Sequence, residues 1–592
     1  MQDQASTPDS KAVPPTATLA DRVRRAAEDR PAHPALVWRD QTISWAELDF
    51  SVDQVADTLR RTVPGPPDGQ PARVAIALTN SPDFVVTFFA TLRAGLVAVP
   101  VNPESTAREL GHVLSDSGAA LLVCTERVRD LVAGLGRDLP ALRAVHTGPP
   151  TGERPTDAPG PVDQPASPRG PVDQLASPRG PVDQPAFPRG GPGIDDLAVL
   201  LYTSGTEGQP KGAMLSHRAL LANHGQIERI SPRVVGPDDR VLLALPLFHV
   251  YGLNTGLGSV AYHGACGVLV DRFDPAATLE VIARQRVSVV VGVPAMFLGW
   301  SGLPGLDAAL APVRLAVCGA APLEPATSAR FSEAAERPIF VGYGLTETAP
   351  VLTSTLASTE PKAGSIGGPI PDVEVRLVGP TGEILWSAGS TGPGGSSATA
   401  TGAGGRDAVD TETDVDEPDV ELFSPGTDPG EIVVRGPNLF SGYWPDGRDG
   451  PDADGWWATG DVAYADADGD LHLVDRLGEL ILVNGFNVYP REVELVLDAH
   501  PAVVESAVVG QPDPRTGQAV KAYVVRVDGG AVTEPELLGH CARNLARFKR
   551  PSTVEFVTAL PHSVIGKVRK TLLRSSPAES PDTAPEGRLS DA

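Results

Sequence analysis

Short apolar runs alternate with longer amphipathic stretches over much of the chain. The apolar run at 73–78 precedes residues 81–95, in which apolar positions recur at helical spacing, and the run at 287–293 precedes a similar stretch at 294–300. Alternation of this kind is typical of βα units. We therefore expect an α/β fold whose sheets are mainly parallel.

The pattern changes near Gly368. Residues 372–378 and 430–436 form shorter runs with polar residues between the apolar ones, which predicts antiparallel strands. Nearer the C-terminus, the β-branched runs at 520–527 and 553–557 are separated by a stretch of helical character. This part of the chain is expected to form a small α/β unit.

Residues 241–270 contain no Asp, Glu, Lys or Arg, and the stretch is long enough to span a bilayer. It also contains Pro246, Asn254, two histidines and five glycines. Such interruptions favour a strand, a loop and a buried helix around an apolar interior. We expect no transmembrane segment, although peripheral contact with a membrane remains open.

Two segments lack the composition of a folded core. Residues 160–189 repeat one decamer three times, within the Pro/Gly-rich stretch 148–193, and have almost no apolar face with which to stack. Residues 387–429 are rich in Gly, Ser and Thr and then acidic. We interpret both as disordered insertions and expect the ends, 1–16 and 575–592, to be disordered too. A repeated docking motif is the alternative for the decamers.

Composition narrows the functional classes. The 592 residues carry 49 basic and 74 acidic side chains, a net charge of −25, which opposes binding to nucleic acid. Four widely spaced cysteines, with no Cys-x-x-Cys pair, suit a reducing compartment and exclude a zinc knuckle. The first residues show no basic segment followed by an apolar one, so cytoplasmic residence is expected.

Residues 200–217 have the composition of a loop that binds phosphate. An apolar run leads into Thr, Ser and Gly, whose small size lets backbone N–H groups approach an anion, and Lys211 adds a positive charge. The segment is not a Walker A loop, because Pro210 precedes the lysine and Gly212 follows it. A glycine-rich turn with a surface lysine is the structural alternative.

Four further segments carry candidate chemistry. Residues 341–350 combine an aromatic ring, glycines and threonines with Glu347, which suits a nucleotide ring beside a carboxylate for a hard metal ion. Asp461 follows a Thr-Gly turn, where a carboxylate can bind ribose hydroxyls. Asp475 and Arg476 open a third segment, and Lys567 stands on a glycine turn. Each has a structural interpretation as well, but all of them together, in this order, indicate nucleotide chemistry.

With these motifs, the chain resembles the acyl-adenylate-forming superfamily of acyl- and aryl-CoA synthetases, adenylation domains and beetle luciferases. It is most similar to bacterial long-chain fatty-acid CoA ligases. The resemblance covers nearly all of residues 19–573. It implies a large AMP-binding N-terminal domain over 17–475, built of βα subdomains and a small β-barrel-like subdomain, and a small mobile C-terminal α/β lid over 476–574.

The resemblance also implies roles for individual residues toward ATP, Mg²⁺ and CoA. Glu347 would hold Mg²⁺, and Lys567 would bridge the substrate carboxylate and the α-phosphate during adenylation. Asp461 and Arg476 would bind the ribose, and Gly485 would leave room for the pantetheine arm of CoA. The ATP phosphates would be bound by Thr203, Ser204, Gly205, Thr206, Gly208 and Lys211. The adenine would lie between Gly319, Ala320 and Ala321 on one side and Tyr343 on the other. Gly344 and Thr346 would also contact the nucleotide.

The substrate is expected to be a carboxylic acid with an apolar chain, a medium- or long-chain fatty acid. His249 stands where amino-acid-adenylating relatives carry an aspartate, so no partner for an ammonium group is evident. With Val293 and Gly319 it would line an acyl channel, which His249 could gate. A core histidine bonded to the backbone is the alternative.

Two positions depart from the family pattern. Glu207 stands where relatives commonly have Thr or Ser in the phosphate loop, which puts a negative charge near an anion. At the hinge, relatives usually have Asp or Lys, whereas this chain has Gly478, which loses a side chain and gains backbone freedom.

Other functions stay open. A fatty acyl-AMP ligase that loads a carrier protein is the nearest alternative, although its characteristic insertion is not evident. An aryl-acid CoA ligase and a catalytically weak binding module are further alternatives. The sequence leaves chain length and oligomeric state undetermined.

The decamer segment is predicted to be dispensable. It has too few apolar residues to join a core, and longer surface loops cost little additional closure entropy. Deleting residues 160–189 should leave the melting temperature and the turnover unchanged. A marked fall in either, measured by thermal denaturation and pyrophosphate release, would show that the decamers pack or dock.

Overall fold

The computed structural model describes residues 18–63, 71–135, 139–150, 192–203, 210–389, 426–483, 486–513, 515–527, 531–563 and 567–574. The segments expected to be disordered lie mostly outside these ranges. The chain divides into two compact units. The first includes the residues up to Val375 and Val434–Trp457, and the second includes Arg376–Ser387, 426–433 and the chain from Ala458 onward.

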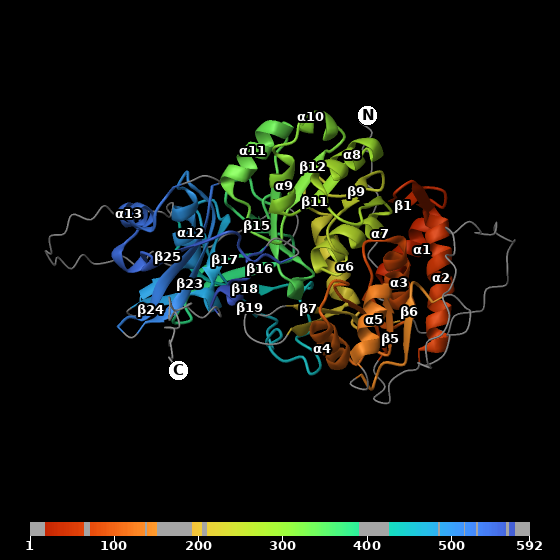
Figure 1. Ribbon diagram of the computed structural model, residues 1–592. Coiled ribbons are helices and arrows are strands. Elements are labelled where there is room, and N and C mark those ends of the chain that lie inside the picture. Colours follow the sequence, from red (N-terminus) through yellow and green to blue (C-terminus); the bar gives the residue numbers. More distant parts are fainter. Residues whose placement is uncertain are drawn as a thin grey trace, which may run out of the picture. The chain divides into compact units, whose positions relative to one another are not determined.

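The first unit contains a six-stranded sheet in the order β6-β5-β3-β4-β7-β8. Figure 1 labels β5, β6 and β7 of this sheet. Its neighbours pair in parallel from β6 to β7, and β7 and β8 form an antiparallel pair. The strands are β3 (Arg73–Ala77), β4 (Val97–Pro100), β5 (Leu121–Cys124), β6 (Ala144–Thr147), β7 (Leu197–Thr203) and β8 (Lys211–Ser216). The helices before and between them are α1 (Leu19–Asp29), α2 (Trp45–Thr62), α3 (Pro82–Arg93), α4 (Ala107–Ser117) and α5 (Glu126–Leu135).

A second sheet of this unit has nine strands in the order β15-β14-β13-β12-β11-β9-β10-β1-β2. Its centre, from β13 to β1, is parallel, which confirms the prediction of mainly parallel sheets. The strands are β1 (Pro34–Trp38), β2 (Gln41–Ser44), β9 (Arg240–Leu243), β10 (Cys266–Leu269), β11 (Val289–Gly292), β12 (Leu315–Cys318), β13 (Phe340–Gly344), β14 (Val351–Ser354) and β15 (Gly368–Pro369). The helices are α6 (His217–Ile227), α7 (Ser259–His263), α8 (Pro275–Gln285), α9 (Pro294–Trp300), α10 (Leu306–Ala309) and α11 (Pro325–Ala335).

The local sequence explains where these helices begin. At α3, Pro82 fits the first helical position, and the Ser81 hydroxyl accepts a hydrogen bond from the backbone N–H of Phe84 at 3.4 Å. Phe84, Phe88 and Phe89 of this helix are buried. The predicted βα unit at 73–95 is thereby confirmed as β3 and α3.

The uncharged stretch 241–270 forms β9, a π-helix η2 (Tyr251–Gly258), α7 and β10, nearly all of it buried. This confirms the expected strand, loop and buried helix. Among the described residues, no helix has the length and apolar character to cross a bilayer.

Most residues of the next sheet belong to the second unit. Its five strands have the order β17-β16-β18-β19-β20, with β17 and β20 at the edges. A barrel closes only when its edge strands pair. The expected β-barrel-like subdomain is therefore an open sheet in the described residues. The strands are β16 (Glu374–Val378), β17 (Ile384–Gly389), β18 (Gly430–Arg435), β19 (Trp457–Ala465) and β20 (Leu471–Arg476).

The C-terminal residues form the predicted small α/β unit. One sheet has the order β22-β21-β24-β23, with β25 paired to β24, and helices α12 and α13 cover an apolar core that includes Val488, Val508 and Leu537. The elements are β21 (Ile481–Val483), β22 (Phe486–Val488), α12 (Pro490–Asp498), β23 (Val503–Asp513), β24 (Gly517–Arg526), α13 (Glu534–Asn544), β25 (Thr553–Val557) and α14 (Lys570–Arg574). The expected boundary between residues 475 and 476 stays a proposal.

Candidate active site

The phosphate-loop candidate is held by a β-hairpin. Thr203 at the end of β7 pairs directly with Lys211 at the start of β8. Residues 204–209, which include Ser204, Gly205, Thr206, Glu207 and Gly208, lie outside the described part of the chain. The Nζ atom of Lys211 lies 3.0 Å from Oδ2 of Asp449 and 5.0 Å from the ring centroid of Tyr443. Half of the Lys211 side chain is exposed.

Glu347 lies on a short 3₁₀ turn, η3 (Thr346–Thr348), directly after β13. Only 6% of Glu347 is exposed, and its Oε1 atom accepts a 2.6 Å hydrogen bond from the Tyr443 hydroxyl. The chain before the turn has no room for a side chain at Gly344, because a Cβ there would lie 1.7 Å from the Pro350 carbonyl oxygen. The glycine thus lets the chain fold back and bury the carboxylate.

Buried amide side chains bind the backbone of this turn. Asn438 is fully buried and donates to the carbonyl oxygens of Thr348 at 2.7 Å and Val351 at 3.2 Å. Asn223 of α6 donates to the same Val351 carbonyl at 2.8 Å and accepts from the Val351 N–H at 3.2 Å. The sequence analysis missed both residues, since single asparagines outside any motif carry no distinguishing signal.

A third buried amide, that of Asn254, is supported by a histidine, His224. Asn254 of η2 donates to the carbonyl oxygen of Ala349 at 2.7 Å, so its own oxygen remains as an acceptor. His224 Nε2 lies 3.0 Å from that oxygen and must therefore carry the proton. Burial lowers the pKa of His224 to about 3, which keeps the ring neutral at physiological pH.

The adenine candidates lie at the carboxyl ends of two adjacent parallel strands. Gly319 follows β12, which pairs with β13, and Tyr343 near the end of β13 is 8% exposed. Ala320 has the left-handed φ of +67°. A Cβ at Gly319 would lie 3.0 Å from the Tyr251 hydroxyl and 3.1 Å from the Gly342 carbonyl oxygen. The structure thus brings Gly319, Gly342 and Tyr343 to one edge of the sheet, with Ala320 and Ala321 next along the chain.

The substrate candidates lie on neighbouring elements of the same unit. Val293 follows β11 and is buried, and the Gly319 N–H donates to the Gly292 carbonyl at 3.1 Å. His249 precedes η2, and its Nδ1 atom accepts from the backbone N–H of Tyr251 at 3.3 Å. A small gap beside η2 has no room for a water molecule, and it is surrounded by Leu242, Leu243, Leu245, Gly252, Gly256 and Val291.

In the second unit, the ribose candidates are a cross-strand pair. Asp461 of β19 lies opposite Arg476 of β20, and the Arg476 Nε atom donates to Oδ1 of Asp461 at 2.9 Å. The Asp461 N–H donates to the hydroxyl of Thr459 at 3.1 Å. Lys567 is exposed, and its backbone exchanges hydrogen bonds with Ser563 at 2.7 and 3.0 Å. Gly485, the CoA candidate, lies outside the described residues.

A buried charge cluster surrounds the hinge candidate. Gly478 lies in η4 (Leu477–Glu479), and Lys570 pairs with Glu479 at 3.0 Å and with Glu494 at 2.8 Å. Burial lowers the pKa of Lys570, but the carboxylates of Glu494 and Glu479 raise it by more. Burial raises the pKa of Asp475 to about 6, against the opposing effect of Lys570.

Comparison with known proteins identifies the family. The family model described as AMP-binding enzyme matches residues 23–393, and the model of the AMP-binding enzyme C-terminal domain matches residues 492–567. The chain belongs to the AMP-binding enzyme family. The resemblance drawn from the motifs is thus confirmed.

Relatives of this AMP-binding enzyme include CoA ligases that are named after different acids. It is 35% identical over 541 residues to a feruloyl-CoA synthase of Amycolatopsis sp, covering 90% of this chain and 93% of that one. It is 33% identical over 519 residues to a long-chain-fatty-acid–CoA ligase of Yersinia pestis, covering 85% and 84%. The ATP-bound MatB structure from Rhodopseudomonas palustris matches with a TM-score of 0.75 and 30% identity, covering 94% and 98%. The α/β fold is that of adenylate-forming enzymes, and the chain is an enzyme of the AMP-binding CoA ligase family.

Asp475 is predicted to make stability depend on pH. The pKa of Asp475 in the folded protein, about 6, lies above the ordinary value of 3.8. Its carboxyl group therefore contributes at most about 3 kcal/mol to the free energy of unfolding. This contribution is complete at low pH and is lost as the pH rises through 6. The Arg476 N–H donates to Oδ1 of Asp475 and the Arg491 N–H donates to Oδ2. Asp475→Asn removes the ionisation and keeps one of these two acceptor oxygens, so one hydrogen bond is lost at every pH. The melting temperature of the variant minus that of the wild type should therefore rise as the pH increases from about 4 to about 6, between these two pKa values, and should level off above that range.

Asp40→Asn, at an exposed turn, is the control and should show no such trend. A difference for Asp475→Asn that stays constant over this pH range would contradict the assignment.

Proposed function

We propose that the chain is an ATP-dependent acyl-CoA synthetase. It activates a carboxylic acid as an acyl-AMP with release of pyrophosphate, and then transfers the acyl group to the thiol of CoA. A carboxylate is a poor acyl donor, and exchanging one of its oxygens for a thiol needs a better leaving group. Forming the acyl-AMP supplies that leaving group.

One observation carries the proposal: Lys211 and Glu347 both contact the same residue, Tyr443. The hairpin end that bears the lysine and the turn that bears the buried carboxylate both contact Tyr443. Binding a nucleoside triphosphate requires a cation that contacts the phosphates and a carboxylate that holds the metal ion.

The donor set fits Mg²⁺. This ion is usually bound through one or two carboxylates together with substrate phosphates, rather than by a cage of protein ligands. Glu347 supplies one hard carboxylate, and the described residues contain no cluster of three or more His, Cys, Asp or Glu that could hold a metal alone. Glu347 would therefore hold the ion together with the nucleotide, and the bound ion would supply positive charge where negative charge develops on the phosphates.

The remaining residues take roles that follow from their chemistry. Asp461 can accept hydrogen bonds from ribose hydroxyls, with Arg476 holding its carboxylate in place. Lys567, whose side chain is exposed, would offset the repulsion between the substrate carboxylate and the α-phosphate. Gly478 would be the point at which the C-terminal residues change their arrangement between the two half-reactions.

We propose a fatty acid as the substrate class. The residues that pack together along β9 and β11 are apolar and buried, so they offer no charged partner for a polar chain. Val293, which follows β11, is buried as well. His249 lies just before η2, between Leu245 and Gly252 along the chain. The fatty-acid ligase relative supports this choice.

An aryl acid is the second candidate, favoured by Tyr251. The residue is 6% exposed, burial raises the pKa of its hydroxyl, and that hydroxyl has no hydrogen-bond partner among the described residues. An unpaired buried hydroxyl is costly, and a polar group on a substrate ring could pair with it. The feruloyl-CoA synthase relative acts on an acid of this type by name.

Lys567 is predicted to serve only the first half-reaction. Removing one fixed charge from a developing oxyanion typically costs about 10² to 10³ in rate. Lys567→Ala should lose acyl-AMP formation to this extent, yet convert supplied acyl-AMP and CoA into thioester at the wild-type rate. Single-turnover assays of the two half-reactions measure this.

Arg569→Ala removes an exposed cation two positions away and is the matched control. Equal loss of both half-reactions in Lys567→Ala would refute the assigned role.

A panel of acids tests the function and separates the two substrate classes. Pyrophosphate release would be measured with fatty acids of several lengths and with ferulate, each with and without CoA. Fatty acids should give the highest kcat/KM, and Tyr251→Phe should leave their KM unchanged. If ferulate is the better substrate, Tyr251→Phe should raise its KM about tenfold, the effect of one lost hydrogen bond.

Tyr464→Phe, in the second unit, is the control for this panel. Pyrophosphate release without thioester formation would favour a ligase that loads a carrier protein. No release with any acid would disprove the proposed function.

A further inference from the structure

One segment of the first unit contacts both candidate ATP-binding motifs. This bridging segment, residues 438–449, lies between β18 and β19 and contains none of the motif residues assigned above. It runs beside β8: the Ser441 N–H donates to the Met214 carbonyl at 2.9 Å, the Met214 N–H to Gly442 at 3.1 Å, and the Trp444 N–H to Gly212 at 2.8 Å. The bridging segment thus extends the phosphate hairpin by backbone pairing.

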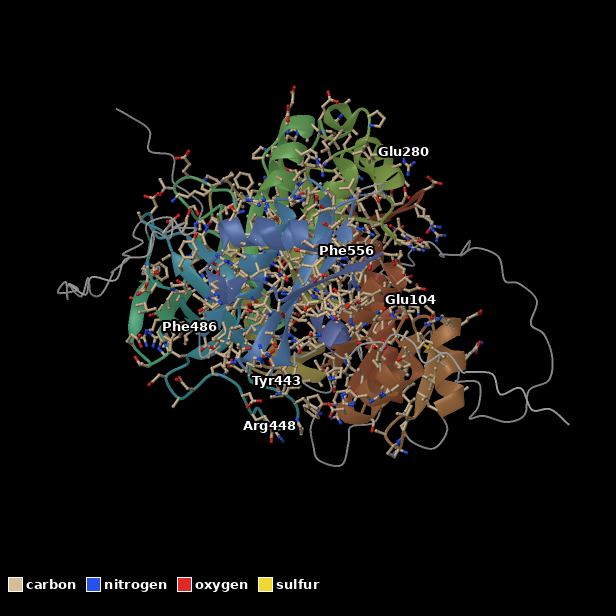
Figure 2. All side chains as sticks on the ribbon, turned by 60° about the vertical axis from the view of Figure 1, so that its left-hand side comes forward. Glu104, Glu280, Tyr443, Arg448, Phe486 and Phe556 are labelled. Carbon is tan, nitrogen blue, oxygen red and sulfur yellow. The ribbon has the colours of Figure 1, made fainter. Side chains whose placement is uncertain are left out.

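The same segment also binds the turn of Glu347. The Phe440 N–H donates to the Glu347 carbonyl at 2.8 Å, and Asn438 donates to the carbonyl of Thr348. Hydrogen bonds from a single short stretch therefore fix the distance between the hairpin and the carboxylate turn. Figure 2 labels Tyr443 and Arg448 on this stretch.

Tyr443 is the side chain that joins the two motifs. Its hydroxyl donates to Oε1 of Glu347 at 2.6 Å, and Nζ of Lys211 lies 5.0 Å from its ring centroid, within range of a cation–π contact. Lys211 forms its ion pair with Asp449, at 3.0 Å, and not with Glu347. The tyrosine therefore binds the carboxylate while its ring stands beside the lysine.

The ring of Tyr443 is held in place from several sides. Phe440 packs edge-on against it, with ring centroids 5.0 Å apart, and Trp457 packs in the same way against Phe440 at 5.1 Å. The backbone of Tyr443 accepts from the Gly447 N–H at 2.8 Å and donates to the Arg448 carbonyl at 3.0 Å. Gly442, with a φ of +95°, lets the chain turn here, since a Cβ would lie 2.0 Å from the Gly447 oxygen.

We propose that Tyr443 is a positioning residue for the metal-binding carboxylate. Its hydroxyl holds one oxygen of Glu347, so that the carboxylate keeps a single orientation and is held apart from Lys211, which Asp449 retains. Without the hydroxyl, Glu347 can rotate and pair with Lys211, and both charges are then less available to metal and phosphate. This proposal rests on the proposed function, because it assigns Glu347 to Mg²⁺.

The test is a Mn²⁺ titration of Tyr443→Phe. Mn²⁺ stands in for Mg²⁺ and can be followed directly by electron paramagnetic resonance on the full chain with ATP present and no acid. A lost hydrogen bond to a charged acceptor should weaken Mn²⁺ binding about tenfold. The melting temperature, measured alongside, should stay within a few degrees of the wild type, as expected for the loss of about one net hydrogen bond.

Two further variants separate positioning from general damage. Tyr262→Phe is the matched control, because Tyr262 also donates to a carboxylate, Glu228 at 3.3 Å, in the first unit, and it should leave Mn²⁺ binding unchanged. In the background of Glu347→Gln, Tyr443→Phe should weaken Mn²⁺ binding no further, since the tyrosine acts through that carboxylate.

The outcomes distinguish this proposal from the proposed function. Equal Mn²⁺ affinity in Tyr443→Phe and the wild type, or an additive loss in the double variant, would overturn the positioning role alone. If the wild type binds ATP with no dependence on Mn²⁺, both the proposed function and the positioning role are wrong.

Discussion

The turn that carries Glu347 is buried, so its backbone polar groups have to find hydrogen-bond partners inside the protein. The partners are amide side chains from separate elements: Asn223 of α6, Asn254 of η2 and Asn438 of the bridging segment. A buried carbonyl that loses such a partner costs about 1–3 kcal/mol, so each amide restricts the turn to one conformation. The position of the carboxylate therefore depends on side chains from three separate segments of the chain.

Parallel strands supply the frame around this turn. Because neighbouring parallel strands end at the same edge of a sheet, β11, β12 and β13 bring Val293, Gly319 and Tyr343 to one side. Glycine recurs where the chains approach most closely: a side chain at Gly319 would meet Tyr251, and one at Gly344 would collide with Pro350. Backbone geometry thus sets the space that any substrate could occupy.

The second unit uses charge instead of amides. Lys570 forms ion pairs with Glu479 and Glu494, and it also interacts electrostatically with Asp475. Along the chain, Asp475 precedes Gly478 and the other three residues follow it. The raised pKa of Asp475 reflects its burial, which outweighs the opposing effect of Lys570. The cluster links the residues after β20 to α12 and α14. Gly478, between Leu477 and Glu479, has no side chain to restrict its backbone.

The sequence by itself determined the kinds of element and the kind of chemistry. The alternation of apolar runs and amphipathic stretches records local periodicity, so it predicted βα units such as β3 with α3 and the α/β unit at the C-terminus. Motif composition identified the family, because a loop that binds phosphate needs small residues and a cation close together in the chain. It also made Glu347 and Lys211 the candidates for binding the metal ion and the phosphates. The expected barrel was wrong for the described residues, since closure depends on whether two distant edge strands pair.

Only the tertiary structure decided which distant residues hold those motifs in place. Tyr443 and Glu347 are 96 residues apart, and Lys211 and Asp449 are 238 residues apart. Neither Tyr443 nor Asn438 stands out in the sequence, because a hydrogen bond between separate segments leaves no periodic or compositional trace. Such contacts are fixed by how whole elements pack, and packing depends on the shape of every neighbour at once.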